Sequence, residues 1–155
     1  MDQVVLLHPE IGWNAGNAGR SCLAFGAQLH LVEPLGFRTD AREVRRAGLD
    51  YWTRVAPRIW KSWDAFEAAL PSLGEPLFLS GEGERILWEV ALPDPAVLIF
   101  GKESTGLPAS LRDRFRDRLV RIPMIDPAIR SLNLSTTVGL ALYEACRQRA
   151  HRRDL

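Results

Sequence analysis

Three small polar side chains alternate where a polar loop gives way to a helical pattern in the C-terminal part of the chain. They are Ser131, Asn133 and Ser135, whose hydroxyl and amide groups can cap a helix or bind a ligand. One interpretation is that one of them caps the helix and the others are loop residues; the other is a ligand-binding loop. The apolar residues that follow have helical spacing and predict one buried face, formed by Leu134, Val138, Ala141, Leu142 and Ala145.

A glycine-rich loop is the second candidate for chemistry. The apolar run from Ala96 to Phe100 is the clearest buried strand of the chain, and it leads directly into Gly101-Lys102-Glu103-Ser104-Thr105-Gly106-Leu107-Pro108. Ligands of open parallel sheets bind at the carboxyl ends of the strands. This exit loop is therefore a candidate wall of a binding site.

A helix opening near the N-terminus is unusually rich in small residues. The stretch from Asn14 to Phe25 predicts a helix with Asn14 as its N-cap and Gly26 after its last turn. Gly16 and Gly19 each weaken such a helix by about 1 kcal/mol relative to alanine. We therefore expect another backbone or a ligand to approach this helix closely.

The sequence lacks the motifs of several common enzyme classes. The chain has no Gly-x-Gly-x-x-Gly, no Gly-x-x-x-x-Gly-Lys-Ser/Thr and no Gly-x-Ser-x-Gly motif, which disfavours nucleotide hydrolysis and acyl transfer. His8, His30 and His151 have no metal-ligand spacing, so we expect no catalytic metal. Cys22 and Cys146 both fall within helical patterns, and we interpret them as buried, reduced thiols.

The order of the predicted elements indicates an α/β fold with a parallel-type sheet and flanking helices. Residues 1–155 contain no repeat, linker or low-complexity tract, so we expect one domain without a separate RNA-binding domain. The predicted strands are Val4 to Leu7, Leu29 to Val32, Tyr51 to Val55, Pro76 to Ser80, Ala96 to Phe100 and Leu119 to Ile122, and the later predicted helices are Trp63 to Leu70, Pro108 to Phe115 and a long one ending near Arg149.

Charge is unevenly distributed although the net charge is only +1. Residues 64–103 carry two basic and eight acidic side chains, whereas residues 104–155 carry ten basic and five acidic ones. This bias allows a basic surface but does not by itself indicate nucleic acid. The N-terminus has neither a basic signal-peptide region nor an apolar run long enough to span a bilayer, so we expect a cytoplasmic protein.

Three segments together resemble the motifs of the SPOUT superfamily of RNA 2′-O-methyltransferases. They are Asn14-x-Gly16-Asn17-x-x-Arg20, then Phe100-Gly101-x-Glu103-x-x-Gly106-Leu107-Pro108, and finally Ile122-Pro123-Met124 followed by Ser131-Leu132-Asn133-Leu134-Ser135 and Tyr143-Glu144. The resemblance covers almost the whole chain and is weakest over residues 53–94.

Two further runs are similar to one subgroup, the small bacterial enzymes that methylate the ribose of the tRNA wobble nucleotide. These runs are Glu33-Pro34-Leu35-Gly36-Phe37 and Arg45-Arg46-Ala47-Gly48-Leu49-Asp50-Tyr51. The chain departs from the subgroup at Gly12-Trp13, where consecutive prolines are usual, and in residues 126–130, which are one residue longer.

The resemblance implies a C-terminal deep trefoil knot and S-adenosylmethionine as the cofactor. Three exit loops of the sheet, after about Ser80, Phe100 and Ile122, would form the knot and wrap the cofactor. Leu79, Gly101, Ile122 and Ser131 match positions that contact it, largely through backbone groups. A side chain at position 101 would then crowd the cofactor.

The resemblance also implies direct methyl transfer to a ribose 2′-oxygen, with the residue matching Arg20 in the central role. A guanidinium group has a pKa above about 12, so neutral arginine is too scarce for a good base. We therefore expect Arg20 to orient the substrate and stabilise alkoxide charge, with an RNA phosphate as a candidate proton relay. Glu103, Asn133 and Ser135 would hold Arg20 or the ribose; the alternative for Arg20 is a surface cation paired with Glu103.

The expected partners are tRNA, at its anticodon loop, and a second copy of the chain in a homodimer. Candidate RNA contacts are Asn14, Arg45, Arg46, Tyr143 and Arg147. Tyr143 and Arg147 could equally pack between subunits, and Arg45 and Arg46 could be solvated surface residues. Two functional alternatives remain: 2′-O-methylation of another tRNA or ribosomal RNA nucleotide, and a catalytically silent RNA-binding dimer.

Overall fold

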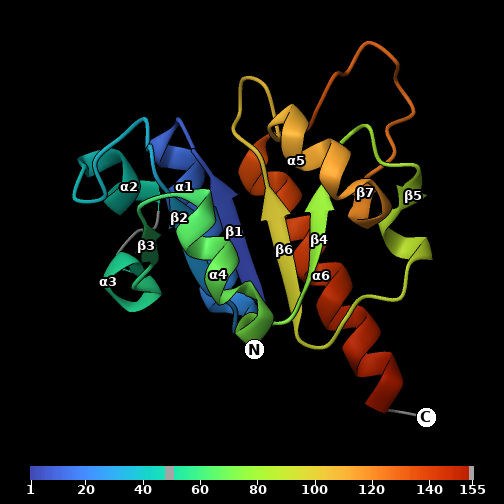
Figure 1. The fold of residues 1–155 in the computed structure, drawn as a ribbon. Coiled ribbons are helices and arrows are strands. Elements are labelled where there is room, and N and C mark those ends of the chain that lie inside the picture. The colour runs from blue at the N-terminus through green and yellow to red at the C-terminus, as the bar shows by residue number, and fades with distance from the viewer. Residues whose placement is uncertain (48–50, 154–155) are drawn as a thin grey trace.

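A seven-stranded sheet forms the centre of the molecule (Figure 1). The computed structural model describes residues 1–47 and 51–153, apart from the side chains at positions 43, 45, 47 and 153. The strand order is β3-β2-β1-β6-β4-β7-β5, and every neighbouring pair is parallel. The strands are β1 Gln3–Leu7, β2 Gln28–Val32, β3 Arg58–Trp60, β4 Glu75–Leu79, β5 Arg85–Ile86, β6 Ala96–Phe100 and β7 Leu119–Arg121.

Helices cover both faces of the sheet, and α4 lies in front of it in Figure 1 while α6 passes behind. The alternation of side chains along each strand divides the core between these faces. Val4 and Leu6 pack with residues of α1 and α6, whereas Val5 and Leu7 pack with residues of α4 and α5. The helices are α1 Gly12–Phe25, α2 Arg42–Ala47, α3 Trp52–Val55, α4 Trp63–Leu73, α5 Ala109–Arg114 and α6 Leu134–Arg153, with the 3₁₀ turns η2 Leu87–Glu89 and η3 Arg116–Arg118.

The predicted α/β class with a parallel sheet is confirmed, and five of the six predicted strands are present within about two residues. The prediction for Tyr51 to Val55 is wrong. Residues Trp52–Val55 form helix α3, and the strand follows at Arg58–Trp60. Strand β5 was not predicted, because its two residues are too few to show a period.

Helix α1 begins earlier than predicted, and α3 packs closely against it at Gly19. It starts at Gly12 with Ile11 as the N-cap residue, so the prediction of Asn14 as its cap is wrong. Gly26 adopts the predicted left-handed conformation, with φ of 68°. A Cβ atom on Gly19 would lie 2.9 Å from Cγ1 of Val55. The absence of a side chain at Gly19 therefore allows α3 to pack against α1.

The two cysteines have different environments. Cys22 is buried, and burial raises the pKa of its thiol to about 12. Cys146 is exposed on α6, so the prediction that it is buried is wrong. The predicted buried face of α6 is confirmed, since Leu134, Val138, Ala141, Leu142 and Ala145 are all buried.

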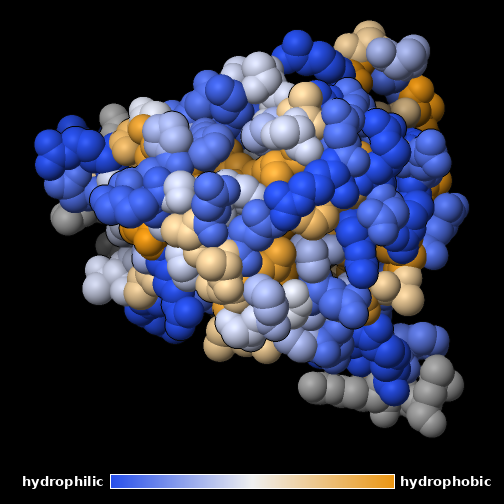
Figure 2. Space-filling view, in the orientation of Figure 1, coloured by the Kyte–Doolittle hydropathy of each residue, from blue (hydrophilic) through white to orange (hydrophobic). Residues whose placement is uncertain are grey.

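The face shown in Figure 2 is mostly hydrophilic, with small separate hydrophobic areas between the charged side chains. Within the described residues, none of the helices is both long and apolar enough to cross a membrane. The same part of the chain contains no group of three or more His, Cys, Asp or Glu side chains placed to hold a metal ion.

Candidate functional site

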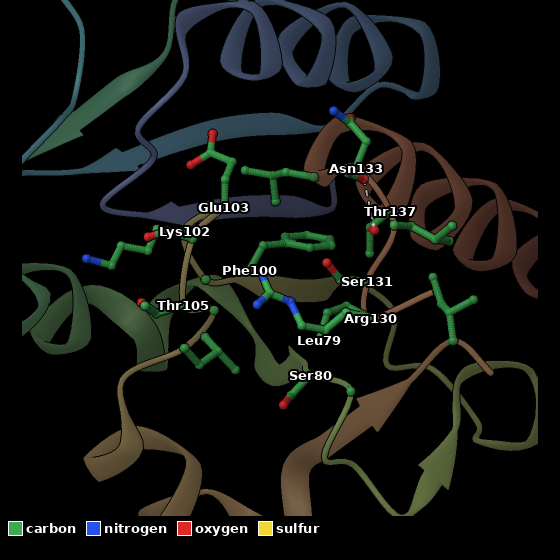
Figure 3. A pocket seen from close by; sticks show the side chains of 18 of the residues that line it. Leu79, Ser80, Phe100, Lys102, Glu103, Thr105, Arg130, Ser131, Asn133 and Thr137 are labelled. Atoms are coloured by element: carbon green, nitrogen blue, oxygen red, sulfur yellow. Dashed lines mark hydrogen bonds between the residues drawn. The ribbon is translucent and has the colours of Figure 1, made fainter. Parts of the chain in front are cut away.

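A cavity of about 860 Å³ lies at the carboxyl edge of the sheet (Figure 3). Strand β6 pairs with β4, and β4 pairs with β7, so the ends of these strands lie side by side. Because all three run in the same direction, their exit loops open on the same edge. Residues from these three loops and from the start of α6 line the cavity.

The lining combines an apolar floor with a polar rim. Leu79 and Phe100 are paired at the ends of β4 and β6, and Leu107 is buried beside them. The rim carries hydroxyl, amide and charged side chains, among them Ser80, Glu82, Lys102, Glu103, Thr105, Arg112, Arg130, Ser131 and Asn133. Such a cavity suits a ligand with one flat apolar part and one charged part.

Glu103 joins the exit loop of β6 to the start of α1. Its carboxylate accepts hydrogen bonds from the backbone N–H groups of Glu10, at 2.7 Å, and Ile11, at 3.1 Å. It also accepts one from the side-chain amide of Asn14, at 3.2 Å. A negative charge at the N-terminus of α1 is favourable, since the first N–H groups of a helix have no partner within it.

A second carboxylate joins the same two loops in the opposite direction. Glu10 accepts hydrogen bonds from the side-chain hydroxyl and the backbone N–H of Ser104. These two bonds hold the pKa of the Glu10 carboxyl below its ordinary value. The loops after β1 and β6 are therefore fastened by two reciprocal carboxylate contacts.

Asn133 is the residue that caps α6. Its side-chain oxygen accepts hydrogen bonds from the N–H groups of Ser135, at 2.9 Å, and Thr136, at 3.2 Å, and from the Ser135 hydroxyl. Its amide nitrogen donates to the side-chain oxygen of Asn14 at 2.9 Å. The two interpretations of this polar run therefore overlap, because Asn133 caps the helix and also lines the cavity with Ser131.

Gly101 sits against the backbone of its own loop. Lys102 and Gly106 form an antiparallel bridge, which brings the returning chain next to Gly101. A Cβ atom on Gly101 would lie 2.0 Å from the carbonyl carbon of Gly106 and 2.1 Å from the nitrogen of Leu107. A side chain here would therefore meet the protein backbone, and the expectation that it would crowd the cofactor stays a prediction.

A sequence model of the SpoU rRNA methylase family matches residues 2–143. The chain belongs to this family. A relative named tRNA (cytidine(34)-2′-O)-methyltransferase, from Burkholderia cenocepacia, is 45% identical over 150 residues, which cover 96% of this chain and 96% of the relative.

Solved structures agree with this membership. One, described as giving structural insights into the 2-OH methylation of C/U34 on tRNA, has a TM-score of 0.88 and 44% identity, and the match covers 96% of both chains. The SpoU methyltransferase AviRb from Streptomyces viridochromogenes, in complex with its cofactor AdoMet, has a TM-score of 0.82 and 25% identity over 96% of this chain and 60% of that one.

The four predicted cofactor contacts of this SpoU methylase come together. Leu79, Gly101, Ile122 and Ser131 all line the cavity, each on one of the three exit loops or at the edge that they share. Of the predicted catalytic residues, Glu103 and Asn133 also line it, whereas Ser135 lies in the first turn of α6.

Arg20 lies elsewhere on this SpoU methylase chain. It is exposed on α1 and does not line the cavity, and its guanidinium carbon lies 5.9 Å from the centre of the Tyr51 ring. Arg54 approaches the same ring at 5.8 Å. Within the described residues no ion pair joins Arg20 to Glu103, whose carboxylate faces the start of α1 instead. The alternative that pairs the two side chains is therefore wrong.

The predicted RNA contacts differ in their exposure and in their partners. Asn14 is 6% exposed and engaged with Glu103 and Asn133, whereas Tyr143 is 59% exposed. Arg46 is exposed, and the side chain of Arg45 lies outside the described residues. Arg147 pairs with Glu144 at 2.7 Å and keeps the pKa of that carboxyl below its ordinary value.

Several site residues were not predicted. Glu10, Ser104, Glu82, Arg112 and Arg130 all take part in the cavity or its fastening. Glu10 could have been found from its place in the exit loop of a buried strand. Arg112 could not, because its helix gives no sign of facing the edge of the sheet.

Proposed function

We propose that this chain transfers a methyl group from S-adenosylmethionine to the ribose 2′-hydroxyl of the wobble nucleotide of tRNA, a cytidine or modified uridine at position 34. The proposal rests on the relative named tRNA (cytidine(34)-2′-O)-methyltransferase, which is 45% identical and is matched over 96% of both chains. The cavity supports it independently, because its walls are the three loops predicted to hold the cofactor.

The residues at the cavity fit this cofactor. A volume of about 860 Å³ is ample for a ligand of that size, since such sites span roughly 300–1,000 Å³. The floor formed by Leu79 and Phe100 suits an adenine ring. The backbone of Gly101 and Ile122 can hydrogen-bond the edges of that ring, and Ser131 can bind a ribose hydroxyl.

The chain itself mainly has to align two atoms. S-adenosylmethionine supplies the activated methyl group when bound. The ribose 2′-oxygen must then approach in line and lose its proton. We assign Arg20 to orienting the ribose and stabilising negative charge on that oxygen. Because Arg20 does not line the cavity of its own chain, this role requires the cavity of the second copy in the proposed homodimer. Glu103, Asn133 and Ser135 hold the loops that shape the site, through the hydrogen bonds around Asn14.

Basic and aromatic side chains offer a surface for RNA. Arg20, Arg54 and Tyr51 form one exposed group beside α3, and exposed Arg46 belongs to neighbouring helix α2. Guanidinium groups bind phosphates, and an exposed aromatic ring can stack on an unpaired base. We include Arg45, Tyr143 and Arg147 among the RNA contacts, and assign Asn14 an indirect role through Glu103.

Residues 1–155 act as one methyltransferase domain whose C-terminal part forms a deep trefoil knot, which the placing of β7 between β4 and β5 favours. The active form is a homodimer in the cytoplasm. Helices α1 and α6 pack on each other, and Trp13 on α1 and Leu140 on α6 are exposed by 45% and 43%, which offers apolar surface to a second copy.

The decisive experiment is nucleoside mass spectrometry of tRNA. Total tRNA and ribosomal RNA from a strain lacking this protein are incubated with the purified chain and S-adenosylmethionine, and the methylated nucleotides are mapped. We expect 2′-O-methylation at position 34 only after incubation. Methylation at another tRNA or ribosomal RNA nucleotide would favour the first alternative. Cofactor or RNA binding without any methyl transfer would favour the silent dimer.

The same assay tests the role of Arg20. We expect Arg20→Ala to reduce the rate at least about 100-fold, as removal of a charge-stabilising group commonly does, without changing cofactor affinity. Arg116→Ala is the matched control, because Arg116 is an exposed arginine that pairs only with Asp113 among the described residues. A folded Arg20→Ala variant with near-normal activity would exclude this role.

A further inference from the structure

Two side chains of opposite charge face each other on the wall of the cavity. Arg112 is on α5, and Glu82 is in the loop after β4. Both line the cavity, and a guanidinium nitrogen of Arg112 forms an ion pair with a carboxylate oxygen of Glu82. The Arg112 side chain is only 26% exposed, whereas that of Glu82 is 67% exposed.

One hydrogen-bond donor of Arg112 is unpaired in the part of the chain that the structure describes. Its Nε atom is buried and has no hydrogen-bond partner within the described residues. A buried donor without an acceptor is unfavourable, and the arginine fork presents parallel donors that match a carboxylate. The guanidinium therefore has a donor that Glu82 does not satisfy, and a ligand carboxylate would supply the missing acceptor.

The other charged groups of the rim are less suited to this role. The Glu103 carboxylate already accepts bonds from Glu10, Ile11 and Asn14. Figure 3 shows the Lys102 side chain extending away from the middle of the cavity, and Arg130 reaching inward next to Leu79 and Ser131. Arg130 is thus the one rival cation, and it has no carboxylate paired with it within the described residues.

We propose that Arg112 and Glu82 together bind the amino-acid end of S-adenosylmethionine, with Arg112 on the α-carboxylate and Glu82 on the α-ammonium group. This inference rests on the proposed function. The methionine end of that cofactor is a zwitterion, and a paired cation and anion on one wall are its complement. Before binding, Arg112 and Glu82 pair with each other and the Nε atom of Arg112 has no acceptor among the described residues; on binding, both side chains also contact the ligand.

The inference predicts selectivity within one class of ligands. S-adenosylhomocysteine has the same zwitterionic end, whereas 5′-methylthioadenosine has the same adenosine and thioether without it. Arg112 and Glu82 should therefore affect the first ligand and leave the second unchanged. A merely structural ion pair between α5 and the β4 loop would affect both equally.

Isothermal titration calorimetry with these two ligands tests the inference. For Arg112→Leu we expect affinity for S-adenosylhomocysteine to fall about tenfold or more, which corresponds to about 1.4 kcal/mol, and affinity for 5′-methylthioadenosine to stay within about twofold. Glu82→Gln should also weaken binding of S-adenosylhomocysteine but not of 5′-methylthioadenosine, by a smaller factor. Arg112→Lys should recover part of the loss, since it restores charge without the fork.

Arg116→Leu is the matched control, because Arg116 follows α5, pairs with Asp113 and does not line the cavity. Equal losses for both ligands, or no loss, would overturn the inference. A selective loss in Arg130→Leu but not in Arg112→Leu would also overturn it. If Arg112→Leu fails to fold, Glu82→Gln and Arg112→Lys decide by the same comparison. A wild-type chain that binds neither ligand would contradict the proposed function itself.

Discussion

The side chains of Asn14 and Asn133, 119 residues apart in the sequence, are joined by a hydrogen bond of 2.9 Å. Each also makes a second contact that organises the site. The Asn14 amide donates to Glu103, and the Asn133 oxygen caps α6. One continuous network therefore connects the start of α1, the exit loop of β6 and the start of α6, which are the three segments that carry the family motifs.

Asn14→Ala should break this network at its centre. Glu103 and Asn133 would each lose a partner, and we expect the free energy of unfolding to fall by about 1–3 kcal/mol. The methylation rate should fall as well, since both segments bordering the cavity lose a constraint. Urea denaturation and the tRNA assay measure the two effects. Asn17→Ala is the control, because Asn17 is exposed about one turn further along α1; equal stability of the two variants would contradict the prediction.

Substitutions of Asn133 should separate its two roles. Asn133→Ala removes both the cap and the bond to Asn14, and we expect a loss of about 1 kcal/mol or more. Asn133→Asp keeps an oxygen that can cap α6 but cannot donate to Asn14. It should therefore retain most of the stability and lose activity. Ser135→Ala, which removes only one hydroxyl donor to Asn133, should be nearly as stable as the wild type. Circular dichroism melts and methylation rates are measured on the same preparations. An Asn133→Asp variant as unstable as Asn133→Ala, or as active as the wild type, would contradict the prediction.

Gly101→Ala should disrupt the loop after β6. The new Cβ atom would lie 2.0 Å from the Gly106 carbonyl carbon, which is backbone and cannot rotate away. We expect destabilisation of about 1–3 kcal/mol together with weaker binding of S-adenosylhomocysteine. Gly81→Ala is the control for stability, because a Cβ atom there has no neighbour within 4 Å. A Gly101→Ala variant as stable as Gly81→Ala would show that the loop can open at little cost.

Tyr51 should position Arg20. Both Arg20 and Arg54 approach its ring, at 5.9 Å and 5.8 Å, and each such contact contributes about 0.5–1 kcal/mol at an exposed site. We expect Tyr51→Leu to lower kcat for tRNA methylation about threefold or more without changing cofactor affinity. Tyr51→Phe keeps the ring and should restore kcat. Trp88→Leu, at an exposed aromatic residue beside β5, is the control. Equal kcat values for the leucine and phenylalanine variants would argue against a role for the ring.

Stability should depend on pH through His30. This residue is fully buried; its Nδ1 accepts a hydrogen bond from Trp60 at 3.0 Å, so Nε2 carries the proton and faces Gln3 at 2.8 Å. Burial, assisted by the charge of Arg58, lowers the pKa of His30 to about 4. The unfolded chain, with a histidine pKa of about 6.5, binds more protons between these values. The stability present above about pH 6.5 should therefore be lost as the pH falls to about 4, by roughly 3 kcal/mol.

Urea denaturation at pH 7 and pH 4.5 measures this loss. His30→Gln should be less stable at pH 7, because the Trp60 and Gln3 partners are disturbed, but its stability should change less between the two pH values. His151→Gln, at an exposed residue near the end of α6, should show the wild-type dependence. If the free energy of unfolding of His30→Gln changed between the two pH values as much as that of the wild type, the pH dependence would belong to other groups.

Prediction from sequence succeeded where the signal was local and periodic. The run from Ala96 to Phe100 and the spacing of Leu134, Val138 and Leu142 required only one strand or one helix to be interpreted correctly. It failed at Tyr51 to Val55, where aromatic and β-branched residues are typical of a strand. In the structure these residues form helix α3, in which Val55 and Trp52 pack onto Gly19 of α1.

The sequence by itself determined the α/β class, the exit loop after β6 as a site wall, and the motif residues that indicate the family. These follow from local patterns, because apolar periodicity and turn residues act over a few positions. Only the tertiary structure decided that Glu103 binds the start of α1 rather than Arg20, that Asn133 links to Asn14 while capping α6, and that Arg112 reaches Glu82 at the cavity. Those contacts depend on which strand ends lie side by side, and strand order is set by packing of the whole sheet rather than by any one segment.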